Sequence, residues 1–160
     1  MPDEEVLRIL VVCLGNICRS PAGEAALKEA AAEAGLHIEV ESAGTGPWHV
    51  GEPRDPQIRA AGRRAGLEIE GVGRQITSPE DLEPYDVILA MDRSNLHALR
   101  RIAPHLEDRM YLYRSFDPHA DSDEMPDPWG MNDAVFDATI RKARSGAEAI
   151  VDAIMSGRLP

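Results

Sequence analysis

The sequence predicts an α/β fold: one domain over residues 1–160 that contains a doubly wound sheet of about four parallel strands, with helices on both faces. Two runs, 7–13 and 86–91, are almost continuously apolar, as in strands buried on both faces of a parallel sheet. Helical patterns alternate with the strand patterns, and no repeat or linker divides the chain. A length of 160 residues suits one domain.

The first helix is expected directly after the strand at 7–13. It should open at Ser20-Pro21, because serine is a good N-cap and proline is favoured at the first helical position. Its buried face should consist of alanines spaced by four, namely Ala22, Ala26 and Ala30. Gly35 should end it.

The other elements follow from the same periodicities and from turn residues. They are a strand at 37–42, a surface loop at 44–56, a helix at 57–65, the strand at 86–91, a helix capped by Asp92 and stopped by Pro104, a short strand at 110–112, an irregular acidic segment at 114–130 and a helix at 133–154. The residues expected to face inward from the last helix are Val135, Ala138, Ala147, Val151 and Ile154.

Composition and charge exclude several classes of protein. Hydrophobic residues make up 43% of the chain and charged residues 28%, which excludes a disordered chain. The net charge of −11 argues against nucleic-acid or anionic-membrane partners. No apolar run approaches the ~18 residues of a membrane span. The acidic segment 1–5 lacks the basic start of a secretory signal.

The chain has two cysteines, Cys13 and Cys18, too few for a disulfide framework. No second pair of ligands stands at the spacing of a structural zinc site. We therefore expect a reducing, cytoplasmic location, with no metal and no cofactor.

The segment from Cys13 to Ser20 joins the first strand to the first helix and has the pattern Cys-x5-Arg-Ser. A tight loop before a helix offers aligned N–H groups and the helix dipole to an anion. Gly15 and Asn16 tolerate the positive φ that such a loop needs. Arg19 can bind two phosphate oxygens, and the same field favours the thiolate of Cys13. The loop is therefore predicted to bind phosphate beneath a nucleophilic sulfur.

Simpler interpretations of these residues exist. Cys13 could be an inert buried cysteine at the end of a strand. Arg19 could be a surface residue, although positive charge at a helix start opposes the dipole. A phosphoryl transfer also needs a general acid, and both Asp117 and Asp127 precede a proline in the acidic segment. Generic chemistry does not choose between these two aspartates.

Four motifs, in order, make the chain resemble the low-molecular-weight protein tyrosine phosphatases over nearly its whole length. They are Val12 to Pro21 (VCLGNICRSP), Ser42 to Thr45 (SAGT), Ala90 to Leu96 (AMDRSNL) and Pro126 to Trp129 (PDPW). The resemblance implies an α/β phosphatase that needs no metal and forms a cysteinyl-phosphate intermediate.

The resemblance also implies a role for each site residue. Cys13 would be the nucleophile, Arg19 the phosphate clamp and Asp127 the general acid, followed by general base. Asn16 would hold the loop through hydrogen bonds with Ser20 and Ser42, and Ser20 would also bond the thiolate. The expected substrate-binding residues are Leu14, Gly15, Asn16, Ile17, Cys18, Ser20, Trp48 and Trp129, the two tryptophans as walls for the substrate ring.

This chain departs from the family pattern at two positions. Many members carry a histidine that braces the loop asparagine, whereas this chain has Gly71 at the matching place. Bracing of Asn16 is therefore expected to be weaker or to pass to water. Many members also have two tyrosines after Asp-Pro, where Trp129 and Gly130 stand here.

The expected partners are phosphotyrosine proteins, with phosphate as product; the sequence does not give the oligomeric state. A protein arginine phosphatase of the same fold is an alternative, although those enzymes tend to have threonine where this chain has Ile17. A redox-sensing or anion-binding module is a further alternative, since Cys13 and Cys18 could pair on oxidation. The acidic residues Asp121, Asp123 and Glu124 are expected to be solvated loop charges.

Overall fold

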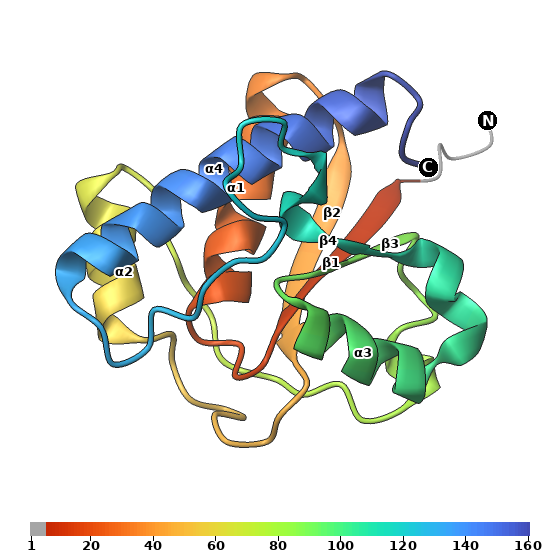
Figure 1. The fold of residues 1–160 in the computed structure, drawn as a ribbon, viewed down its shortest axis with the longest axis horizontal. Helices are drawn as coiled ribbons and strands as arrows, with labels where there is room; N and C mark the ends of the chain where they lie inside the picture. The colour runs from red at the N-terminus through yellow and green to blue at the C-terminus, as the bar shows by residue number, and fades with distance from the viewer. Residues whose placement is uncertain (1–5) are drawn as a thin grey trace.

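Four parallel strands form the central sheet, in the order β2-β1-β3-β4 (Figure 1). The computed structural model describes residues 6–160, so the expectation for segment 1–5 lies outside the described residues. The strands are β1 (Leu7–Cys13), β2 (Ile38–Gly44), β3 (Val87–Ala90) and β4 (Met110–Leu112). The α-helices are α1 (Arg19–Glu33), α2 (Pro56–Arg64), α3 (Arg93–Ile102) and α4 (Asp133–Met155). The predicted doubly wound α/β fold is confirmed.

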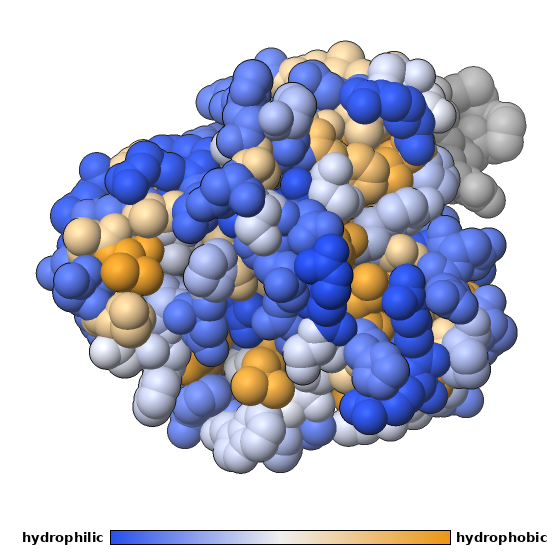
Figure 2. All heavy atoms as spheres, viewed as in Figure 1, coloured by the Kyte–Doolittle hydropathy of each residue, from blue (hydrophilic) through white to orange (hydrophobic). Residues whose placement is uncertain are grey.

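The helices cover both faces of the sheet because the side chains of β1 alternate between two cores. Ile9 and Val11 pack with α1, α2 and α4, whereas Leu10 and Val12 pack with α3. Figure 1 shows α1, α2 and α4 on one side of the sheet and α3 on the other. The face seen in Figure 2 is mainly hydrophilic, with small separate hydrophobic patches.

Strand register places the carboxyl end of β1 at the point where the chain changes direction across the sheet. Val12 pairs with Ala43 of β2 on one side and with Ala90 of β3 on the other. In open α/β sheets, ligands bind beyond the carboxyl ends of the strands at such a switch point. The segment after Cys13 therefore lies where the fold favours a site.

The start of α1 differs from the prediction. The helix begins at Arg19, with Cys18 in the N-cap position and no side-chain cap. Ser20 lies inside the first turn, and its hydroxyl contacts Cys13 instead of capping the helix. The predicted alanine face of α1 is buried as expected.

The buried face of α4 also differs from the prediction. Ala147 and Val151 are buried, but Val135, Ala138 and Ile154 are only half-buried. The face is rotated because Phe136, the largest side chain of the first turns, points into the core. One residue along a helix corresponds to about 100° of rotation, so the interpretation based on Val135 chose the wrong side.

Across residues 6–160, no helix has both the length and the apolar character to cross a membrane.

Candidate active site

A cavity of about 380 Å³ opens at the carboxyl end of β1. It collects residues from the loop after β1, from the loop after β2 and from the acidic segment before α4. Its lining consists of Cys13, Leu14, Gly15, Ile17, Cys18, Arg19, Trp48, His49, Asp127 and Trp129. Two predicted binding residues, Asn16 and Ser20, do not line it and lie fully buried behind the loop.

The loop at 14–18 is shaped by Asn16, which has a φ of +57° and is the one non-glycine residue with positive φ in the described part of the chain. The loop packs closely on the end of β2 at Gly44. A Cβ placed on Gly44 would lie 2.7 Å from the carbonyl oxygen of Leu14. A side chain at Gly44 would therefore push the loop out of place.

Cys13 presents its sulfur at the base of this loop. The thiol is buried, 3.0 Å from the Ser20 hydroxyl oxygen. It also accepts a hydrogen bond from the backbone N–H of Asn16 at 3.2 Å. Both contacts suit a sulfur that carries negative charge.

The loop supplies further N–H groups. Five backbone N–H groups of this segment make no hydrogen bond to a protein acceptor within the described residues. They are those of Leu14, Gly15, Ile17, Cys18 and Arg19. Donors in a loop that leads into a helix can surround an anion.

The Arg19 guanidinium is fixed from behind, and its side chain is only 4% exposed. Its Nη1 donates to Asp92 Oδ2 at 2.7 Å and to the carbonyl oxygen of Met125 at 3.0 Å. Its Nη2 lies 3.9 Å from Asp127 Oδ2. Arg19 thus reaches the cavity in one fixed orientation, beside the acidic side chain.

Of the two candidate acids, the structure brings Asp127 to the cavity and places Asp117 elsewhere. The Asp127 side chain is 50% exposed, and its Oδ1 accepts the backbone N–H of Trp129 at 3.1 Å. Asp117 accepts a hydrogen bond from Ser145 on α4 at 2.6 Å and does not line the cavity.

Trp48 and Trp129 stand at the mouth of the cavity, and each is 63% exposed. The ring of Trp48 lies over Gly46, where a Cβ would overlap it. His49 also lines the cavity and pairs with Glu52 through Nδ1. The mouth is therefore aromatic and largely apolar.

Cys18 lies in the same loop but in a different environment. Burial raises the pKa of its thiol, and the nearby Asp55 carboxylate raises it further. Both cysteines are free thiols. No group of three or more His, Cys, Asp and Glu side chains in the described ranges is arranged to hold a metal ion.

Sequence reasoning missed Asp92 and Arg54. Asp92 was assigned only as a helix cap, yet it also holds Arg19. Arg54 lies in the loop after β2 and donates to Asn16 Oδ1 at 3.0 Å, so an arginine braces Asn16. The expectation from Gly71 is corrected in this respect. No sequence signal marked Arg54, because its partners are distant in the chain.

The acidic residues predicted to be solvated are exposed or half-exposed, and each also pairs with an arginine. Asp121 pairs with the buried Arg114 at 2.7 Å. Asp123 and Glu124 both pair with Arg93, at 2.6 Å and 3.5 Å. These pairs tie down the segment that leads to Asp127.

Comparison with known proteins gives a consistent result. Residues 8–157 match the model of the family described as low molecular weight phosphotyrosine protein phosphatase. The low molecular weight protein-tyrosine-phosphatase YfkJ of Bacillus subtilis is 35% identical over 153 residues, which cover 93% of this chain and 96% of YfkJ.

Solved structures show the same fold. A protein tyrosine phosphatase from Entamoeba histolytica, with Hepes in its active site, superposes with a TM-score of 0.92 at 29% identity, covering 96% of this chain and 99% of that chain. The arginine phosphatase YwlE of Bacillus subtilis superposes with a TM-score of 0.86 and covers 95% of this chain and 98% of its own. Its identity of 23% supports a shared fold alone.

Proposed function

The chain belongs to the low molecular weight phosphotyrosine protein phosphatase family and is a hydrolase that acts on phosphoproteins; from this premise we propose that it cleaves phosphotyrosine through a cysteinyl-phosphate on Cys13. The proposed reaction uses neither metal nor cofactor. One observation carries the proposal: Cys13, Arg19 and Asp127 line a single cavity around free N–H donors.

The loop and Arg19 would bind the phosphate. The N–H groups of residues 14–19 surround the oxygens, and the guanidinium of Arg19 adds a planar pair of donors. Anchoring by Asp92 keeps Arg19 in place, so little reorganisation is needed when charge builds up on the equatorial oxygens.

In the first step, the Cys13 thiolate attacks phosphorus in line with the leaving oxygen. The S–P bond forms while the P–O bond to the tyrosine breaks. Asp127, at the mouth of the cavity, donates its proton to the leaving phenolate oxygen. Arg19, beside Asp127, stays on the phosphoryl oxygens.

In the second step, water attacks the cysteinyl-phosphate. Asp127, now a carboxylate, takes a proton from that water as the O–P bond forms and the S–P bond breaks. Phosphate leaves, and Cys13 returns to the thiolate. The Ser20 hydroxyl and the Asn16 N–H stabilise that thiolate as the leaving group.

Two features of the cavity support an aryl phosphate as substrate. Trp48 and Trp129 provide exposed aromatic faces at its mouth. Ile17 contributes an apolar side chain to its wall, where a hydroxyl could otherwise assist attack on a phosphoramidate. Both features favour phosphotyrosine over phosphoarginine.

A cytoplasmic location and a single working domain over residues 1–160 belong to the same proposal. A nucleophilic thiolate needs a reducing compartment to stay active.

The proposal is tested by steady-state hydrolysis of a phosphotyrosine peptide and a phosphoarginine peptide of the same sequence, in excess chelator. We expect the phosphotyrosine peptide to be preferred, and Cys13→Ser to abolish turnover. A preference for phosphoarginine would move the substrate class, and turnover by Cys13→Ser would contradict the nucleophile.

A further inference from the structure

Arg54 is a buried arginine beneath the phosphate loop, on the side away from the cavity. Its side chain is 5% exposed although it belongs to the loop between β2 and α2. Its Nη1 donates to the carbonyl oxygen of Asn16 at 2.6 Å and to Asn16 Oδ1 at 3.0 Å. Its Nε donates to the Glu70 carbonyl oxygen at 3.0 Å. Arg54 therefore binds both the backbone carbonyl oxygen and the side-chain oxygen of Asn16, the residue with positive φ in the loop.

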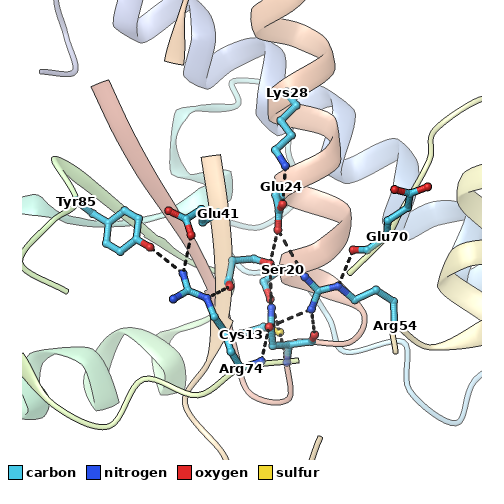
Figure 3. Close-up of polar contacts among 11 residues, drawn as sticks. Cys13, Ser20, Glu24, Lys28, Glu41, Arg54, Glu70, Arg74 and Tyr85 are labelled. Carbon is cyan, nitrogen blue, oxygen red and sulfur yellow. Dashed lines mark hydrogen bonds and ion pairs between the residues drawn. The ribbon is translucent and has the colours of Figure 1, made fainter. Parts of the chain in front are cut away.

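The Arg54 guanidinium also contacts side chains of β2 and α1. Its Nη2 donates to Ser42 Oγ at 3.3 Å and lies 3.6 Å from Glu24 Oε1 (Figure 3). On another side it lies against Gly71, where a Cβ would be 3.4 Å from Nη2. Gly71 has a φ of +97°, so a side chain there would be strained. A Cβ at this position would make only ordinary van der Waals contact with the guanidinium.

The hydrogen bonds from Arg54 can run in one direction only. An arginine side chain has donors and no acceptor, so the Asn16 amide must turn its oxygen toward Arg54. The backbone N–H of Arg74 donates to the same oxygen at 3.0 Å. The amide nitrogen of Asn16 must then donate, and it does so to Ser20 Oγ at 2.9 Å and to Ser42 Oγ at 3.0 Å.

The same reasoning gives the direction of the hydrogen bonds from Asn16 to the sulfur of Cys13. Ser42 accepts from Asn16 and from Arg54, so its own proton goes to Glu24, at 2.5 Å. Ser20 accepts from Asn16, which leaves its proton to point at Cys13 Sγ, 3.0 Å away. A thiolate has no proton to give, so this orientation is the one that stabilises it.

We propose that Arg54, held by Glu24 and Ser42, is a positioning residue that fixes the loop through Asn16 and orients the Ser20 hydroxyl as a donor to the Cys13 thiolate. The inference rests on the proposed function only in that this thiolate is taken to be the nucleophile. Because arginine stays protonated, the direction of the network does not change over the working pH range.

Charge near the site supports this role. Burial lowers the pKa of Arg54, and the neighbouring Glu24 and Cys13 oppose that shift. Lys28 pairs with the other oxygen of Glu24 at 2.7 Å. Glu24 thus lies between two basic side chains, as Figure 3 shows, and is the ion-pair partner of the buried guanidinium.

The test follows the alkylation rate of Cys13 with iodoacetamide as a function of pH, in Cys18→Ala protein so that one thiol reacts. The variant Arg54→Met keeps the length of the side chain and removes every donor. In Arg54→Met, we expect the pH at which the alkylation rate of Cys13 is half its maximum to rise by about one unit. We also expect kcat/KM for a phosphotyrosine peptide to fall about tenfold or more. The control, Arg64→Met, removes an exposed arginine of α2 that pairs with Asp137 on α4. It should change neither value.

A second comparison separates positioning from a merely structural role. Ser20→Ala removes the hydroxyl through which Arg54 is proposed to act. If the proposal holds, Arg54→Met shifts the alkylation midpoint much less in a Ser20→Ala background than alone. Additive shifts, or no shift in the single variant, would overturn it. The other titratable groups that line the cavity with Cys13, namely Arg19, His49 and Asp127, are unchanged throughout, so their effects cancel.

Arg54→Lys keeps the result interpretable if Arg54→Met does not fold. Lysine retains the charge but not the fork of donors, so we expect a smaller shift in the same direction. A midpoint equal to that of the parent protein would overturn the proposal. Alkylation does not depend on turnover. If the alkylation midpoint does not shift in the Arg54 variants, only the role of Arg54 is contradicted. If the parent protein is alkylated normally but does not hydrolyse phosphotyrosine, only the proposed function is contradicted.

Discussion

The two cysteines of the phosphate loop lie five positions apart in the chain and have different environments. Cys13 has hydrogen-bond donors on its sulfur, from Ser20 and from the Asn16 N–H. Cys18 is buried without such support, and desolvation raises the pKa of its thiol. Only Cys13 is therefore suited to nucleophilic attack.

The raised pKa of Cys18 predicts a pH-dependent loss of stability. The folded protein keeps this proton at pH values where the unfolded thiol, with an ordinary pKa of ~8.5, loses it. The stabilisation that the protonated Cys18 thiol gives is therefore complete below the unfolded pKa. Above that pKa, the free energy of unfolding falls by about 1.4 kcal/mol per pH unit. Urea unfolding at about pH 7.5 and about pH 9.5 should show a larger drop for the native sequence than for Cys18→Ala. Equal drops would show that Cys18 does not keep its proton.

Asp127 predicts a change in the shape of the pH–rate profile. Protonation of Asp127 is required for the first step, so activity should fall on the alkaline side as the carboxyl ionises. Asp127→Asn should lower kcat by about 10²–10⁴-fold for a phenolic leaving group and should remove that alkaline limb. Asp117→Asn, at the aspartate bound to Ser145, is the matched control and should leave the profile as it was. A retained alkaline limb in Asp127→Asn would assign the acid elsewhere.

Among the elements, α3 does more than cover the sheet. Its N-cap, Asp92, uses Oδ1 to accept the N–H of Asn95 at 2.8 Å and Oδ2 to accept from Arg19 at 2.7 Å. One carboxylate therefore caps α3 and fixes Arg19, the proposed phosphate clamp. The position of α3 and the reactivity of the loop are coupled through this side chain.

Substitutions at Asp92 should separate its two tasks. Asparagine is as good an N-cap as aspartate, so Asp92→Asn should cost little stability while weakening the charge that holds Arg19. We expect kcat/KM to fall about tenfold in Asp92→Asn. Asp92→Ala should show the same loss of activity and should also destabilise the protein by about 1 kcal/mol. Thermal unfolding and steady-state kinetics of both variants provide the check, and an Asp92→Asn enzyme with full activity would rule out the anchoring role.

Periodicity and turn chemistry predicted most of the elements. The strands at 7–13 and 110–112 have the predicted bounds, because an apolar run leaves little choice of register in a buried sheet. The predicted start of α1 was wrong because the Ser20 hydroxyl contacts Cys13 instead of capping the helix. Capping preferences alone do not take such a tertiary contact into account. Rotation of α4 depends on Phe136, whose place is decided by packing against other elements.

The place of the candidate site was predictable where its residues follow one another in the chain. Cys13 to Ser20 span the end of β1, the loop and the start of α1, so their proximity follows from the sequence. Arg54 could not be inferred, since its contacts reach Asn16, Ser42 and Glu24 across 38, 12 and 30 positions of sequence. Generic chemistry did not choose between Asp117 and Asp127; the family resemblance favoured Asp127, and in the structure Asp127, not Asp117, lines the cavity.

For the molecule as a whole, the net charge is negative, whereas the charge beside the phosphate loop is positive. The chain carries a net charge of −11, yet its phosphate loop is flanked by the buried guanidinium groups of Arg19 and Arg54. A doubly charged phosphate is thus attracted locally by an overall anionic protein. The surrounding field should matter most for the residues that flank the phosphotyrosine in a substrate.

This distribution predicts a dependence on salt. Peptides with basic residues beside the phosphotyrosine should have a higher kcat/KM than peptides with acidic ones, because the net field attracts the former and repels the latter. Chloride salt raised from about 0.01 M to about 0.5 M should reduce that ratio several-fold, since the Debye length shortens below the size of the protein. A ratio that does not change with salt would mean that flanking preference arises from direct contacts.

The most direct test of the account is to trap phosphate on the enzyme. Rapid acid quenching of a phosphotyrosine peptide reaction, followed by peptide mapping, should find phosphate on Cys13 within the first turnover. The phosphoenzyme should build up further in Asp127→Asn with an activated aryl phosphate, whose leaving group needs no proton. Phosphate on another residue, or full turnover with no phosphoenzyme in either protein, would contradict nucleophilic catalysis by Cys13.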